Sequence, residues 1–235
     1  IKVYTPVSSD EVGTSQRHDG TAGTGYSLEG GAVRYGIGIY EEYIRIDGIE
    51  VVGTLVTGGS GDDGGIIRIM TTATQDSDIR ILNSLIHGNN NVNAYVNAIT
   101  VWTDCVVYIA NNLIYDMYST GLYLNNITFT TPVIIYNNTV TSSNQYNNSS
   151  RAGIRLAETA SCAILKNNLV AENGYQDYRY QSYAHLDSEY NFTSDSTAPG
   201  SNAVISASVS FLDESNDNFH LSSSDTTAID AGTDL

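Results

Sequence analysis

The chain has 235 residues, of which 41% are hydrophobic, and its 26 acidic residues outnumber ten Lys and Arg, for a net charge of −16. Such a charge repels the phosphate backbone of nucleic acid, so we expect no nucleic-acid partner. Its apolar runs are far shorter than the roughly 18 residues that predict a membrane-spanning helix, so we expect no membrane span.

Residues 1–35 begin with a strand-like segment, IKVYTPV, and continue as a polar, Gly-rich loop without helical periodicity. We interpret this part as an opening strand and loop. No amphipathic capping helix precedes the strand, so we expect the first coil to present an unpaired strand edge over apolar side chains.

Residues 36–184 repeat one pattern of three short strands. Five copies join two apolar strands through a polar corner, at Asp47, Asn83, Asn111, Asn137 and Asn167. Upstream of each corner lies another short strand that opens with a small residue, namely GIGIY, GGIIRIM, AITVW, GLYLN and GIRLA. Three strands in each repeat of roughly 25 to 35 residues predict an all-β fold, a right-handed parallel β-helix of five to six turns. We expect a single domain over 1–235, with irregular C-terminal turns at 185–235.

Stacked coils place equivalent corner residues above one another. We expect Asn111, Asn137 and Asn167 to form a ladder whose side-chain amides bond from turn to turn. If that ladder is buried, Asn137→Ala removes a partner from a buried group and costs about 1 to 3 kcal/mol.

The two cysteines, Cys105 and Cys162, fall near the start of equivalent strands two turns apart. That separation is roughly 10 Å, which is beyond disulfide reach, so we expect two buried thiols. No Cys and His cluster has metal-ligand spacing, and the acidic loop GGSGDDGG at 58–65 lacks the spaced ligands of a calcium loop. We therefore expect no metal and no cofactor.

Glycosylation sequons begin at five Asn residues. The polar loop with Asn147 and Asn148 is the expected place for a glycan, with Asn126 as a further candidate. An acidic, Lys-poor, Asn-rich and Ser-rich surface is common outside the cell, so we expect an extracellular or cell-surface protein.

Several segments together resemble a known group of proteins: RHDGTAGTGYSL, YEEYIRIDGIEV, the corners NNLIYD and NNTVT, then DSEYNFTSD and FHLSSSDTTAIDAGTDL. The chain is similar through nearly its whole length to secreted right-handed β-helix proteins of the pectin-lyase-like superfamily, in which an AIDAGT-type repeat precedes a C-terminal anchor. The resemblance implies the fold. It does not fix the activity, because the superfamily includes lyases, hydrolases, tailspikes and structural adhesins.

In resembling enzymes the substrate groove lies on the outer face of the first strand of each turn. Alternation along these strands directs the apolar residues inward and leaves outward Gly38, Tyr40, Arg68, Met70, Thr100, Trp102, Tyr123, Asn125, Arg155 and Ala157. We predict a binding face of Tyr40, Trp102 and Tyr123, flanked by Arg68 and Arg155. Aromatic rings beside cations suit stacking on sugar rings or burial against a protein.

This outward set contains no carboxylate, whereas glycoside hydrolysis needs two. Asp104 and Glu158, just past their strands and two turns apart, are the candidates for such a pair at roughly 10 Å. Solvated corner residues are the favoured interpretation of both. Arg68 and Arg155 lack the acidic cluster of a calcium-dependent lyase, and neither a Ser-His-Asp arrangement nor a GxSxG motif is evident.

We therefore expect a secreted structural or adhesive surface module that is not an enzyme. Its expected partner is a further copy of itself, joined end to end into a filament, or a neighbouring surface protein. The alternative is a polysaccharide-active lyase or hydrolase, or a carbohydrate-binding domain, whose partner is a polysaccharide.

Overall fold

The structure is a computed structural model that describes residues 1–30, 35–53, 64–71, 78–88, 96–103, 105–125, 132–143, 145, 147–157, 163–180 and 187–234. Within these residues the chain folds into three parallel sheets. Sheet A has the order β1-β4-β7-β10-β13-β16 and is built from β1 Lys2–Tyr4, β4 Arg45–Asp47, β7 Asp78–Leu82, β10 Val106–Ala110, β13 Val133–Tyr136 and β16 Ala163–Lys166.

Sheet B has the order β19-β17-β14-β11-β8-β5-β2. Its strands are β2 Ser27–Gly30, β5 Glu50–Gly53, β8 Leu85–His87, β11 Leu113–Tyr115, β14 Thr139–Thr141, β17 Leu169–Ala171 and β19 Phe192–Thr193. Sheet C has the order β18-β15-β12-β9-β6-β3 and contains β3 Ile37–Ile39, β6 Gly65–Ile69, β9 Asn97–Val101, β12 Leu122–Leu124, β15 Ile154–Leu156 and β18 Tyr178–Arg179. A short helix, α1, spans Ser9–Val12.

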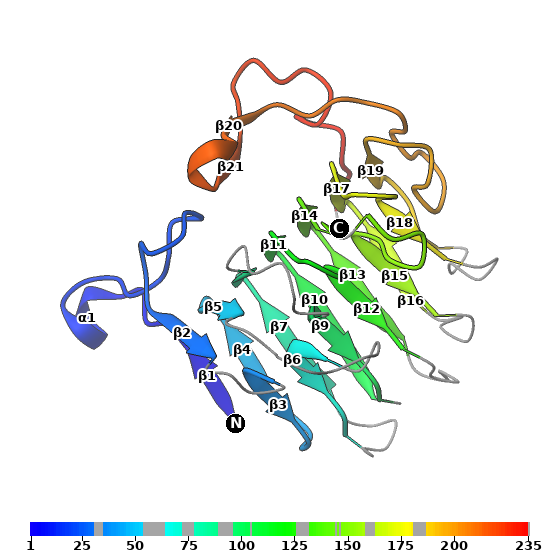
Figure 1. The fold of residues 1–235 in the computed structure, drawn as a ribbon. Helices are drawn as coiled ribbons and strands as arrows, with labels where there is room; N and C mark the ends of the chain where they lie inside the picture. The colour runs from blue at the N-terminus through cyan, green and yellow to red at the C-terminus, as the bar shows by residue number, and fades with distance from the viewer. Residues whose placement is uncertain are drawn as a thin grey trace.

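From β1 to β19, successive strands belong to different sheets, and each strand pairs in parallel with its equivalent one coil away. Figure 1 shows the resulting coils stacked along one axis. The predicted parallel β-helix is therefore confirmed. The coiling begins earlier than expected, because β1 and β2, inside the predicted opening segment, already pair with β4 and β5.

The core is a set of apolar rows that run along the axis. In the central coils every inward residue of these rows is at most 2% exposed. The rows consist of Ile46, Ile81, Ile109, Ile135 and Leu165 in sheet A, Val51, Ile86, Ile114, Val140 and Val170 in sheet B, and Ile67, Ile99, Leu122, Ile154 and Tyr178 in sheet C. Branched side chains suit these positions because they pack well on a pleated surface with stacked neighbours.

The corner between sheets A and B turns through a left-handed residue. Asn83, Asn111, Asn137 and Asn167 all have φ between 50° and 57°. Asparagine tolerates this conformation far better than most residues do, which accounts for its recurrence at the corner.

A ladder of buried amides follows this corner, one residue later than predicted. Asn112, Asn138, Asn168 and Asn191 are at most 2% exposed. The Nδ2 of each donates to the Oδ1 of the next at 3.0 Å. The prediction that Asn111, Asn137 and Asn167 form the buried ladder is therefore wrong, because the left-handed turn leaves these side chains facing outward.

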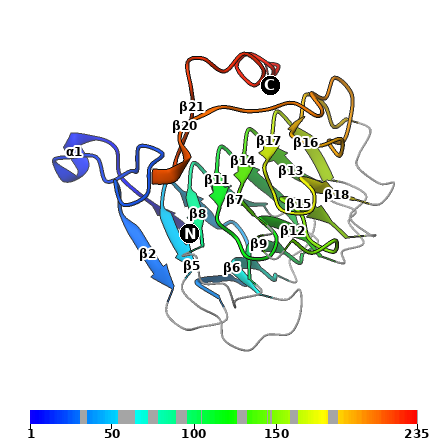
Figure 2. The same ribbon diagram turned by 45° about the horizontal axis from the view of Figure 1, so that its top comes forward.

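The C-terminal segment, residues 200–234, runs back across the outer face of sheet B, and we call it the strap (Figures 1 and 2). It contains β20 Phe211–Asp213, the 3-10 turn η1 Glu214–Asn216 and β21 Asn218–Leu221. Its Val209, Phe211 and Phe219 pack into a second apolar cluster with Leu85, Tyr115, Ala171 and Phe192 of the coils. The Phe219 ring lies 4.8 Å from that of Tyr115.

The segment 225–233, DTTAIDAGT, holds the end of the strap in place. The Asp225 carboxylate accepts hydrogen bonds from the backbone N–H groups of Ser210, Thr227 and Ala228 at 2.7 to 2.9 Å. Farther on, Thr233 exchanges two hydrogen bonds with the side chain of Asn167.

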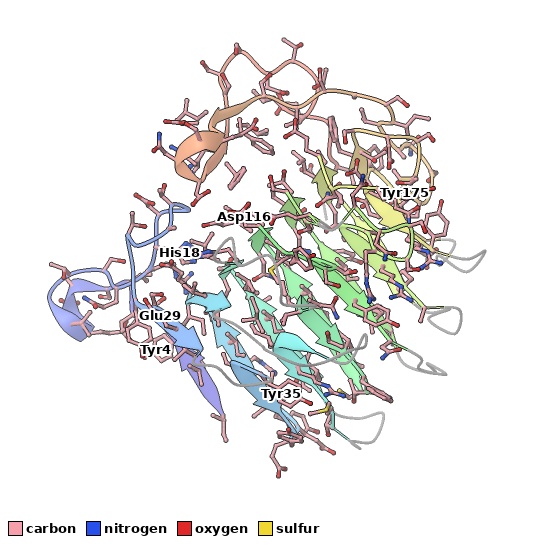
Figure 3. The ribbon with its side chains drawn as sticks, viewed as in Figure 1. Tyr4, His18, Glu29, Tyr35, Asp116 and Tyr175 are labelled. Carbon is pink, nitrogen blue, oxygen red and sulfur yellow. The ribbon has the colours of Figure 1, made fainter. Side chains whose placement is uncertain are left out.

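Asp116 lies beneath the strap, with φ of 54° (Figure 3). Burial raises the pKa of its carboxyl, the nearby Asp217 of the strap raises it further, and His87 partly opposes both. Folding therefore binds a proton at this site. The protonated Asp116 contributes its full share to the stability of the fold below the pKa of about 3.9 that Asp has in the unfolded chain. That contribution is lost as the pH rises through the higher pKa that Asp116 has in the folded protein.

We expect Asp116→Asn, which keeps a residue suited to left-handed backbone, to unfold at a higher temperature than the wild type at pH 7. The two proteins should unfold together near pH 3, where Asp116 is protonated. Thermal unfolding followed by circular dichroism across this pH range measures the difference. A constant offset at every pH would contradict the assignment.

Cys105 is buried as predicted and accepts a hydrogen bond from the Thr103 hydroxyl at 3.2 Å, whereas Cys162 lies outside the described residues. Of the candidate glycan acceptors, Asn147 is exposed and Asn148 is half-buried, and Asn126 is not among the described residues. No helix in the described part of the chain is long and apolar enough to cross a membrane.

Candidate binding face

One row of side chains runs along the outer face of sheet C. The strand register aligns, from the first coil to the last, Gly38, Arg68, Thr100, Tyr123, Arg155 and Arg179. The alternation read from the sequence is thus the alternation of the structure. In the described coils this row contains three cations and no carboxylate, in a chain whose net charge is −16.

Arg68 is held between two aromatic rings. Its guanidinium carbon lies 4.8 Å from the ring centroid of Tyr35, labelled in Figure 3, and 5.4 Å from that of Trp102. It also donates to the Tyr35 hydroxyl. Arg68 is only 5% exposed and Trp102 is 40% exposed. A ligand on this face therefore meets the indole ring first, with the buried guanidinium supplying positive charge behind it.

Arg155 and Tyr123 form a second cation and ring pair, with the guanidinium carbon 4.4 Å from the ring centroid. Tyr123 is buried, and its hydroxyl donates to the Oδ1 of Asn125 at 2.9 Å. Of the three aromatic residues in the predicted binding face, Tyr123 is therefore not accessible to a ligand. Arg155 is half-buried, so the guanidinium is the part of this pair that a ligand reaches.

Three arginines crowd together at the last coils. Burial, together with the nearby positive charges of Arg155 and Arg179, lowers the pKa of Arg151 to about 10. Burial also lowers the pKa of Arg155. Arg179 donates to the Ser150 carbonyl at 2.9 Å. An anion bound between these guanidinium groups would relieve the repulsion among them.

The first coil contributes an aromatic ring at the other end of the face. Gly38 has no side chain, and a Cβ at that position would lie 2.8 Å from the ring of Tyr40. The Tyr40 ring therefore lies over Gly38 and remains 58% exposed. The structure thus places all five residues of the predicted binding face on the outer side of sheet C.

Tyr35, Arg151 and Arg179 were not anticipated from the sequence. Arg179 could have been found, because the YRY at 178–180, which begins with β18, continues the alternation of the preceding coils. Tyr35 and Arg151 lie outside the strands, where no period positions them. The two candidate catalytic acids, Asp104 and Glu158, lie outside the described residues, so their predicted pairing stays a prediction.

The described histidines are engaged elsewhere. His87 lies under the strap, with its Nε2 3.0 Å from the Oε1 of Glu50 and its ring stacked on Tyr115 at 4.7 Å. The Nε2 of His18 lies 2.9 Å from the Asn83 carbonyl. Nowhere in the described ranges do three or more His, Cys, Asp or Glu residues gather in a way that could hold a metal ion.

The fold defines the chain as a parallel β-helix protein with a cationic and aromatic outer strand face. No known protein family, curated protein or solved structure matches the chain. Membership of the pectin-lyase-like superfamily therefore stays a prediction. The parallel β-helix fold is shown by the strand pairing.

Proposed function

We propose that the chain is an extracellular, non-catalytic adhesive module that binds a carboxylated polysaccharide along the outer face of sheet C. The observation that carries the proposal is the row of Arg68, Arg155 and Arg179 with its adjoining rings, in a protein that is otherwise strongly acidic. Of the seven arginines that the structure describes, four lie at this face, since Arg151 adjoins the row.

The chemistry of these groups fits a uronic-acid polymer. Guanidinium groups bind carboxylates through paired, charge-assisted hydrogen bonds, and exposed rings such as Tyr40 and Trp102 stack on the apolar faces of sugars. Stacked strands repeat about every 4.8 Å, so the face presents its groups at regular intervals along the axis. A polymer with one carboxylate per unit can then engage several of them together, which multiplies individually weak contacts.

Recognition rather than hydrolysis is favoured by the composition of the face. General acid and base catalysis of glycoside cleavage needs two carboxylates, and the described part of the strand row offers none. Hydrolysis by Asp104 and Glu158 is the competing proposal, and it predicts cleavage of the bound polymer.

Titration calorimetry with polygalacturonate and with its fully methyl-esterified, neutral counterpart tests the proposal. We expect saturable binding of the acidic polymer that weakens steeply with added salt, and little binding of the neutral one. We also expect no new reducing ends after prolonged incubation. Equal binding of both polymers would contradict the charge-based account. Release of reducing ends that Asp104→Asn or Glu158→Gln abolishes would establish the hydrolase instead.

End-to-end association remains part of the proposal for an adhesive role. The first coil exposes Val3 and Tyr4 of β1 at 48% and 42%, and within the described sheet β1 has a paired neighbour on one side only. Contact with a second copy would bury these side chains and extend the strand pairing.

A further inference from the structure

A pocket of about 260 Å³ opens on the opposite side of the coil from the cationic face. Asn111, Asn137 and Thr139 line it from two successive corners between sheets A and B. The strap contributes Phe219 and His220, and the N-terminal loop contributes Gly20. Three segments far apart in the sequence therefore meet around one hollow.

The left-handed Asn residues of the corners form an outer row of amides, and within the described residues the hydrogen bonds along this row are missing at the pocket. Asn83 donates to Asp47 at 2.8 Å, and Asn111 donates to Asn83 at 3.3 Å. Asn167 is bonded to Thr233 of the strap. Between them, the side chain of Asn137 is exposed and makes no hydrogen bond to any other described residue. An amide that both donates and accepts is thus presented on the pocket wall.

The walls of the pocket are fixed by packing. Phe219 is 7% exposed, with its ring against Tyr115 and edge-on to Phe211. The Nδ1 of His220 lies 2.7 Å from the Oδ1 of Asn218. Gly20 has φ of 103°, and a Cβ there would lie 2.8 Å from the His220 ring, so the N-terminal loop lies directly against the imidazole.

We propose that this pocket binds a single neutral sugar residue, as a second site separate from the cationic face. The amides of Asn111 and Asn137 and the Thr139 hydroxyl can each pair with sugar hydroxyls as donor or acceptor. Phe219 and the adjacent Leu113 supply the apolar surface that the C–H face of a pyranose covers. The lining contains no carboxylate, Lys or Arg, which favours a neutral ligand over a uronate.

Saturation-transfer NMR and titration with glucose, galactose and mannose test this site. We expect at least one of these hexoses to bind, and Asn137→Gly to weaken its affinity about tenfold by removing two hydrogen-bonding groups. Glycine retains the left-handed backbone of this position. Asn147→Gly is the matched control, because Asn147 is also exposed and left-handed, at φ 49°, but does not line the pocket. This control should bind as the wild type does.

The test of hexose binding at the pocket does not depend on whether the cationic face binds a polysaccharide. Asn137→Gly should leave the binding of polygalacturonate unchanged, so a failure at the pocket is distinguishable from a failure of the polysaccharide face. Absence of binding by all three hexoses would overturn the proposal. So would equal affinity of the wild type and Asn137→Gly for the hexose that binds.

Discussion

Asn138→Ala is expected to lower the free energy of unfolding by about 3 kcal/mol or more, because several buried groups lose their partners together. Asn138 is 1% exposed, and its Nδ2 donates to the Ile109 carbonyl at 2.8 Å and to the Oδ1 of Asn168 at 3.0 Å. Its Oδ1 accepts from both the backbone N–H and the Nδ2 of Asn112. Alanine would leave these groups buried and unpaired in the middle of the coil.

Asn137→Gly is the matched control for this ladder. Asn137, which precedes Asn138 in the sequence, is exposed, and glycine tolerates its φ of 54°. We expect a change of about 0.5 kcal/mol or less for this variant, as at other surface positions. Urea unfolding of both variants measures the contrast. Similar losses at the two positions would mean that the buried ladder does not stabilise the coil as described.

Which Asn of each pair is buried could not be predicted from the sequence pattern. In each Asn-Asn pair the first residue turns the chain and the second bonds through the core, and composition alone cannot order them. The segment EYNFT at 189–193, which has one Asn at its corner in place of a pair, carries the signal that was missed. There Tyr190 has the left-handed conformation, at φ 54°, and Asn191 is fully buried in the ladder. An alignment on Asn191 would have assigned the buried role to the second position.

The three-strand period predicted the coils and the outer row because alternation is a local property of each strand. It could not predict the strap, which depends on contacts between distant segments. Its trace in the sequence is the apolar character of outward positions in sheet B, Leu85, Leu113 and Leu169, which pack in the strap cluster. Arg151 was not predicted for a similar reason, since it lies between strands and approaches Arg179 only when the coils stack.

The double substitution Arg155→Gln and Arg179→Gln is expected to weaken polygalacturonate binding by at least tenfold, because hydrogen bonds to charged groups are each worth about 1.5 to 3 kcal/mol. Glutamine preserves much of the side-chain volume and removes the charge. The matched control is Arg80→Gln on sheet A. Arg80 also lies over a tyrosine ring, at 4.8 Å from Tyr108, but is outside the proposed face. Its loss should leave the affinity nearly unchanged.

Titration of the fluorescence of Trp102 tests the central claim most directly, because this residue is the single tryptophan of the chain and lies, 40% exposed, on the proposed face. Polygalacturonate should change its emission in a saturable way, and its methyl-esterified counterpart should not. The midpoint should shift to higher polymer concentration in the Arg155→Gln and Arg179→Gln double variant and stay in place in Arg80→Gln. Calorimetric binding of polygalacturonate without any change in Trp102 emission, or equal weakening by Arg80→Gln, would contradict the assignment of this face.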